Sequence, residues 1–167
     1  MSAATKSSKT RSRATEPAWL NRREMRAWRG YIETIGELQN ALEADLVALG
    51  LSVGDYQVLV YLSESENRQI RMCDLAEKLH LSPSGLTRRL DGLVTMGAVN
   101  RRPSDEDRRV TMGGLTPKGW DLLQRIAPEH VDSVRRHFID LLTPAQLDVL
   151  GDVFDALRVH LRTLKED

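Results

Sequence analysis

The chain has 167 residues, of which 41% are hydrophobic, and this is enough for one domain with a substantial core. Its 24 Lys and Arg residues balance 24 Asp and Glu residues, which excludes a general polycation but allows a basic surface on one face. The single cysteine excludes an intrachain disulfide framework, and the sequence lacks both a long apolar run and the apolar segment of a signal peptide. We therefore expect a cytoplasmic protein that does not bind a membrane.

The first 18 residues contain Lys6, Lys9, Arg11 and Arg13 against a single acidic residue, Glu16, and show no apolar periodicity. This composition predicts a flexible basic tail over residues 1–18. An arm that touches DNA phosphates is compatible with the same residues, and the two interpretations do not exclude each other.

A long first helix is predicted from about Arg22 to Leu49, because an apolar stripe there alternates spacings of four and three residues. Ser52 and Asp55 form a capping pair for a second helix, which is apolar nearly all round and should be buried. The stripe of the first helix consists of Trp28, Ile32, Ile35, Leu42, Leu46 and Leu49, with the polar Gln39 as its one interruption.

Two short helices separated by a tight turn are predicted next. The first runs from Met72 to His80, and the second begins with Ser82 as its cap and Pro83 in the first helical position. The second helix should direct one apolar stripe inward and its small, polar and basic residues outward, which is the pattern of a helix-turn-helix. The inward stripe is Leu86, Leu90, Leu93 and Val94.

A short hairpin follows the helix-turn-helix. A strand is predicted at residues 99–102, a charged turn at 104–109, and a return strand that starts at Val110. Ile70 and Arg71 are predicted to form a minor strand that pairs with this hairpin. Residues 113–114 are both Gly, which weakens the return strand and predicts a mobile hairpin. A helix-turn-helix followed by a basic hairpin predicts a winged helix.

Two further helices complete the chain. Thr116 and Pro117 should begin one of them, with a kink at Pro128, and Thr143 with Gln146 should cap the last. The last helix carries an apolar seam at heptad spacing, and so regular a seam requires a partner helix. The seam is Leu147, Leu150, Phe154, Leu157, Leu161 and Leu164.

The run DEDRRVTMGGLTPKG resembles the wing signature of the multiple-antibiotic-resistance regulator (MarR) family, in which Asp-x-Arg precedes a strand and Leu-Thr-x-x-Gly. RMCDLAEKL and SPSGLTRRLDGL resemble the two DNA-binding helices of that family. The resemblance implies an all-α fold with a small β-wing, in which a winged helix-turn-helix lobe joins a helical dimerisation bundle. We therefore expect the lobe at 51–115 and the dimerisation helices at 19–50 and 116–165.

A DNA-binding surface is expected on the second motif helix and the wing. Arg88 should read guanine or bind phosphate, whereas Arg89 stands where the family usually carries an apolar residue and is assigned to phosphate. Asp107 should brace Arg109, which leaves Arg108 or Arg109 to reach the minor groove. The full set is Ser82, Ser84, Gly85, Thr87, Arg88, Arg89, Arg101, Asp107, Arg108 and Arg109.

Cys73 occupies the expected cap position of the first motif helix. A helix N-terminus lowers the pKa of a thiol, so a redox sensor is one interpretation, but we prefer a small, half-buried substitution. The histidines are scattered, and no metal site, cofactor site or catalytic constellation is evident, so we do not expect an enzyme.

The resemblance also implies a small-molecule pocket beside the lobe, for which Trp28, Tyr31 and Tyr56 are candidate walls. The sequence therefore favours a homodimeric regulator that binds a palindromic operator in double-stranded DNA, as a repressor released by a small-molecule effector. The alternatives are a winged-helix module that binds protein, a redox regulator based on Cys73, and a helical enzyme whose site is not evident.

Overall fold

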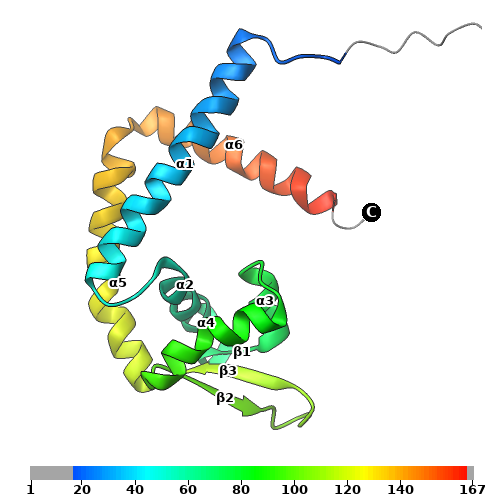
Figure 1. Ribbon diagram of the computed structural model, residues 1–167, viewed down its shortest axis with the longest axis vertical. Helices are drawn as coiled ribbons and strands as arrows, with labels where there is room; N and C mark the ends of the chain where they lie inside the picture. The colour runs from blue at the N-terminus through cyan, green and yellow to red at the C-terminus, as the bar shows by residue number, and fades with distance from the viewer. Residues whose placement is uncertain (1–16, 165–167) are drawn as a thin grey trace, which may run out of the picture. The chain divides into compact units, whose positions relative to one another are not determined.

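The computed structural model describes residues 17–164 (Figure 1) and divides into two compact units, the first ending at Ile35 and the second beginning at Gly36. Of the predicted basic tail, residues 1–16 lie outside the described residues. The helices and strands are α1 (Arg22–Ala48), α2 (Val53–Glu64), β1 (Gln69–Arg71), α3 (Met72–Lys78), α4 (Pro83–Thr95), β2 (Val99–Pro103), β3 (Thr111–Leu115), α5 (Pro117–His137) and α6 (Pro144–Thr163), with short 3-10 turns at Glu66–Arg68 and Ile139–Leu141.

The first unit contains the N-terminal part of α1. Asn21 caps this helix, because its side-chain oxygen accepts the backbone N–H groups of Arg23 and Glu24 at 2.9 and 3.0 Å. Glu24 returns the interaction by accepting the Asn21 N–H at 2.8 Å. Further along the same helix, the rings of Trp28 and Tyr31 lie 6.2 Å apart and both side chains are exposed.

The core of the second unit lies where α2, α3 and α4 pack together against the sheet. The predicted burial of α2 is confirmed on one face, since Val58, Leu59 and Leu62 are fully buried. The capping box that begins α2 is also present, with Ser52 and Asp55 bonding to each other's backbone N–H groups. The remaining core residues are Leu46, Leu51, Leu75, Ala76, Leu86, Leu90, Leu93, Ala98, Val99, Leu115, Leu123 and Ile126.

The three strands form one antiparallel sheet in the order β1-β3-β2, so the predicted minor strand and hairpin are both present. The glycine-rich return strand β3 is central and pairs on both edges, with Gly114 opposite Gln69 on one side and Asn100 on the other. A side chain at Gly114 would come within 2.7 Å of the Asn100 side-chain oxygen. The glycine therefore permits close packing at the centre of the sheet, and the predicted mobility of the hairpin remains a prediction.

The motif Leu-Thr-x-x-Gly has a local physical explanation at the start of α5. The Thr116 hydroxyl accepts the N–H of Gly119 at 3.0 Å and donates to the carbonyl of Gly97 at 2.7 Å. A side chain at Gly119 would overlap the carbonyl of Ala98. Threonine and glycine thus join the start of α5 to the end of the helix-turn-helix.

The two C-terminal helices begin where the sequence predicts. α5 continues through Pro128 to His137 as one helix, and the kink at Pro128 stays a prediction. Thr143 and Gln146 form the predicted capping box of α6. In this single chain no residue of α6 is buried, so the apolar seam is open to a partner.

Three local expectations were wrong. Val94 was placed on the inward stripe of α4, but it is exposed because the buried face is narrower and contains only the three leucines. The polar composition of residues 63–68 predicts a loop, whereas α2 extends to Glu64 and a 3-10 turn follows. Cys73 was placed at the cap of α3, but the cap residue is Arg71 and Cys73 already lies inside the helix.

Candidate nucleic-acid interface

Helix α4 presents opposite faces to the core and to solvent. Its start is held by the Ser82 hydroxyl, which accepts the N–H of Gly85 at 3.1 Å, and by Pro83 in the first turn. Its buried leucine face anchors it in the lobe, while Ser84, Thr87 and Arg88 are exposed. A capped helix with small polar residues and an arginine near its N-terminus has the shape and chemistry to enter a DNA major groove.

The residues on this face differ in their freedom to bind a ligand. The Thr87 hydroxyl donates to the carbonyl of Pro83 at 3.0 Å, and the hydroxyls of Ser82 and Ser84 lie 3.2 Å apart. The Arg88 side chain makes no hydrogen bond or ion pair with any of residues 17–164. Arg88 is therefore the residue of this face with a full set of donors available.

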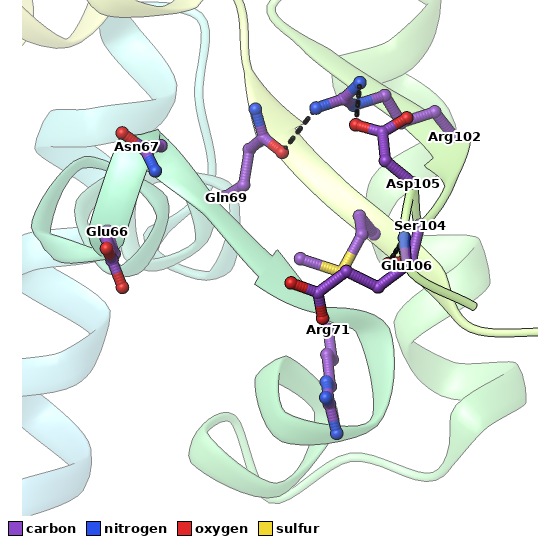
Figure 2. A pocket seen from close by; sticks show the side chains of 9 residues that line it. Glu66, Asn67, Gln69, Arg71, Arg102, Ser104, Asp105 and Glu106 are labelled. Atoms are coloured by element: carbon purple, nitrogen blue, oxygen red, sulfur yellow. Dashed lines mark hydrogen bonds and ion pairs between the residues drawn. The ribbon is translucent and has the colours of Figure 1, made fainter. Parts of the chain in front are cut away.

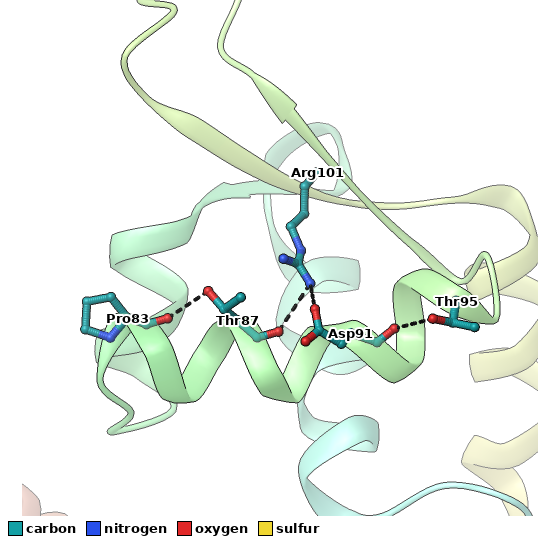
Figure 3. Close-up of polar contacts among 5 residues, drawn as sticks. All are labelled: Pro83, Thr87, Asp91, Thr95 and Arg101. Carbon is teal, nitrogen blue, oxygen red and sulfur yellow. Dashed lines mark hydrogen bonds and ion pairs between the residues drawn. The ribbon is translucent and has the colours of Figure 1, made fainter.

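Arg101 connects the wing to α4 (Figure 3). One terminal nitrogen of its guanidinium donates to Asp91 at 2.6 Å and to the carbonyl of Thr87 at 3.2 Å. Its Nε atom is buried without an acceptor among the described residues. These contacts direct Arg101 toward α4 and give it a role in holding β2 against the helix.

Arg89 also contacts the protein. Its Nη1 atom donates to the Ser52 hydroxyl at 3.2 Å, at the start of α2. The phosphate role predicted for Arg89 is therefore in competition with an internal hydrogen bond.

The wing carries the predicted contact between Asp107 and Arg109. The Asp107 carboxylate accepts the backbone N–H of Arg109 at 2.9 Å and its Nε–H at 3.3 Å. Most of the Arg109 side chain remains in solvent, with 93% of it exposed. Arg108 forms no ion pair within the part of the chain that the structure describes. Both arginines are thus available at the wing tip.

A polar cleft of about 530 Å³ lies between the wing and the segment that precedes α3 (Figure 2). On one side of it Arg102 donates to Gln69 at 2.8 Å and to Asp105 at 3.3 Å, so the wing is fastened to β1. Sequence reasoning missed this contact, since Gln69 and Arg102 are 33 positions apart.

Cys73 is exposed, which corrects the expectation of a half-buried residue. Its thiol donates to Asp74 at 3.1 Å, and that hydrogen bond raises the pKa of Cys73 above its ordinary value. A raised pKa is the opposite of the shift that a redox sensor at a helix N-terminus requires. The local geometry therefore disfavours Cys73 as a reactive thiolate.

A shallow apolar groove of about 830 Å³ lies between α2 and α5, and Tyr56 and Trp120 line it. Burial raises the pKa of Tyr56, whose ring packs on His130 at 4.3 Å, and lowers the pKa of His130. Tyr56 thus lines this groove, while Trp28 and Tyr31 belong to the other unit and remain predicted pocket residues.

A polar cluster that sequence reasoning missed joins α1 to α5. The Asp45 carboxylate accepts hydrogen bonds from Ser133 at 2.6 Å and Arg136 at 2.7 Å, and it lies 3.0 Å from the His137 ring. The Ser133 hydrogen bond is the largest of the causes that lower the pKa of Asp45. The cluster fixes the C-terminal end of α1 on α5.

The described residues, 17–164, contain neither a metal site nor a single helix that could span a membrane. No group of three metal-ligating side chains lies close enough there to hold an ion. None of the described helices alone has the length and apolar character of a membrane span, although α1 and α2 satisfy that test together across a sharp bend.

Comparison with known proteins identifies relatives that are transcriptional regulators. The sequence model of the MarR family matches residues 51–111. AbsC, a MarR family transcriptional regulator from Streptomyces coelicolor, is 40% identical with a TM-score of 0.83, covering 88% of this chain and 99% of its own. Sco3205 from the same organism, solved in complex with DNA, is 36% identical with a TM-score of 0.80, covering 86% and 91%. The transcriptional repressor MprA of Escherichia coli (strain K12) is 30% identical over 122 residues, which is 73% of this chain and 69% of MprA.

Proposed function

The chain belongs to the MarR family of transcriptional regulators, and we propose that it binds a palindromic operator in double-stranded DNA as a homodimer. Its relatives are regulators and not enzymes, in agreement with the lack of any catalytic constellation in the sequence. The observation that carries the proposal is the exposed face of α4, where Arg88 lies beside small polar residues and forms no hydrogen bond or ion pair with any other side chain among residues 17–164. A regulator of this kind works in the cytoplasm, where it meets the DNA.

Two parts of the lobe would meet DNA in different ways. The exposed face of α4 enters the major groove, where Arg88 donates to the O6 and N7 atoms of guanine. The wing arginines, Arg108 and Arg109, lie along the backbone or in the adjacent minor groove, where a narrow A·T-rich segment concentrates negative potential. Arg88 then contributes sequence preference, and the wing contributes mainly affinity.

The dimer would be built from the terminal helices, and residues 51–115 would form the DNA-binding lobe. The open seam of α6 supports this division, because a contiguous apolar helix face in contact with water is unfavourable and indicates a partner. A two-fold dimer places its two copies of α4 about 34–36 Å apart, one turn of the duplex, so that both reach successive major grooves.

We further propose that the protein is a repressor released by a small molecule. MprA is named as a repressor, and the apolar groove beside Tyr56 and Trp120 lies between a helix of the lobe and a helix outside it. A ligand in this groove would act by binding with different affinity to two conformations of the dimer, which differ in the distance between their DNA-binding lobes. A ligand with equal affinity for both would not shift the equilibrium between them.

Selection of duplexes from a random pool, followed by footprinting, tests the proposal. We expect a palindrome with half-sites one helical turn apart, and binding that weakens steeply with salt. A chain that retains no duplex preference would instead support the alternative of a protein-binding module. Release of the parent from DNA by peroxide, but not of a Cys73→Ser variant, would support the redox alternative.

A further inference from the structure

We propose that Arg89 is a positioning residue, which sets the direction in which α4 presents its DNA-facing side chains, and not a phosphate contact. The inference rests on the proposed function for its consequence at DNA, but its geometry lies wholly within the lobe.

The first observation is the hydrogen bonding of the Ser52 hydroxyl. It donates to the Asp55 carboxylate at 2.6 Å, and it accepts the N–H of Asp55 at 3.1 Å and the Nη1–H of Arg89 at 3.2 Å. A serine hydroxyl has one hydrogen to donate and two lone pairs to accept with, so all its capacity is used. Arg89 thus completes the cap of α2 from a helix 37 positions further along the chain.

The second observation is the fit of the guanidinium over Gly54. A Cβ atom at Gly54 would lie 2.5 Å from Cζ, 2.6 Å from Nη1 and 2.8 Å from Nε of Arg89. Only a residue without a side chain leaves room for the planar group at this point. Gly54 and Arg89 are therefore complementary, and even a methyl group would displace the guanidinium.

The contact extends beyond α2. The N–H of Val53, which is adjacent to Ser52, donates to the Glu43 carboxylate at 2.7 Å. Glu43 belongs to the C-terminal part of α1, so a short series of polar contacts runs from α4 through the start of α2 to α1. Both ends of this series lie in the unit that begins at Gly36.

The contact between Arg89 and Ser52 controls how α4 is rotated within the lobe, which apolar packing alone specifies poorly. The buried leucines of α4 hold the helix in the lobe, but apolar contacts are not directional. A hydrogen bond is directional, and Arg89 follows Arg88 by one residue, about 100° around the helix. Fixing Arg89 on Ser52 therefore fixes the rotation of α4, and with it the side of the helix from which Arg88 projects.

The test uses Gly54→Ala, a change that leaves every charge in place. Alanine suits a helix better than glycine, so α2 should keep its stability while the added methyl displaces Arg89. We expect Gly54→Ala and Arg89→Ala to weaken binding to the selected palindromic duplex by the same factor, roughly tenfold when the net value of one hydrogen bond is counted in both protomers. Binding to a scrambled duplex should change much less, and the double variant should equal either single variant.

The phosphate role makes the opposite prediction for each variant. Loss of a phosphate contact in both protomers would flatten the salt dependence of binding by about two units for Arg89→Ala. Gly54→Ala would then release Arg89 toward DNA and leave binding at or above the parent level. Either result would overturn the positioning role.

A second measurement needs no DNA. Amide hydrogen exchange across α4 in the free protein should quicken in Gly54→Ala relative to the parent, with an unchanged thermal midpoint. Unchanged exchange would refute the role of Arg89 even if the palindrome is bound as proposed. Quickened exchange in a protein that shows no duplex preference would support the contact while rejecting the proposed function.

Discussion

The seam of α6 allows the proposed dimer to be tested quantitatively by truncating Leu157 and Leu161 to alanine. In the single chain these residues are 48% and 56% exposed, so a partner helix would bury about half of each side chain. Complete burial of a leucine contributes about 1.5–3 kcal/mol, and half of one therefore contributes roughly 1 kcal/mol. Two leucines in each of two protomers give roughly 4 kcal/mol, or about a thousandfold in the dissociation constant of the dimer.

Sedimentation equilibrium over a series of concentrations measures this constant, and circular dichroism checks that the helices remain. Val159→Ala is the matched control, because Val159 is an apolar residue of the same helix, 65% exposed, but lies outside the seam. We expect the double leucine variant to dissociate and the control to remain dimeric. Equal dissociation constants for all three proteins, or a parent that is already monomeric, would refute the assignment of the seam to a dimer interface.

Three other predictions follow from the described contacts. Arg88→Ala should reduce the free energy of DNA binding by about 1–3 kcal/mol and relax the preference at one base pair per half-site, whereas Arg108→Ala should weaken binding to palindromic and scrambled duplexes alike. Competition binding at several salt concentrations compares the two variants. Cys73→Ser should not change the response of DNA binding to peroxide, as gel shifts would show, because Asp74 raises the pKa of the thiol. The Asp45 carboxylate has a lowered pKa, so it stabilises the fold at pH values above its ordinary value of 3.8, and this contribution is lost as the pH falls through the lowered pKa. Denaturation should therefore find Asp45→Asn less stable than the parent at neutral pH, with a difference that shrinks as the pH falls below 3.8.

The helix boundaries were accessible from the sequence because the interactions that set them are local. Four helices begin with a Ser or Thr whose side chain accepts the backbone N–H group three residues ahead, so each cap can be recognised within four consecutive residues of the sequence. These caps are Ser52, Ser82, Thr116 and Thr143. The order of helix, turn, helix and hairpin follows from the same signals, and the relatives confirm the family that it resembled.

The side-chain roles were decided by contacts between distant positions. Arg89 lies 37 positions from Ser52, and Ser133 lies 88 positions from Asp45, and no periodic pattern in the sequence indicates either contact. Val94 shows the related limit for packing: a helical wheel identifies residues on one side of a helix, but neighbouring elements decide how wide a strip is covered. Local hydrogen bonds and periodicity therefore determined the elements, while the three-dimensional packing of α2, α4 and the sheet determined which arginines contact other residues among 17–164 and which do not.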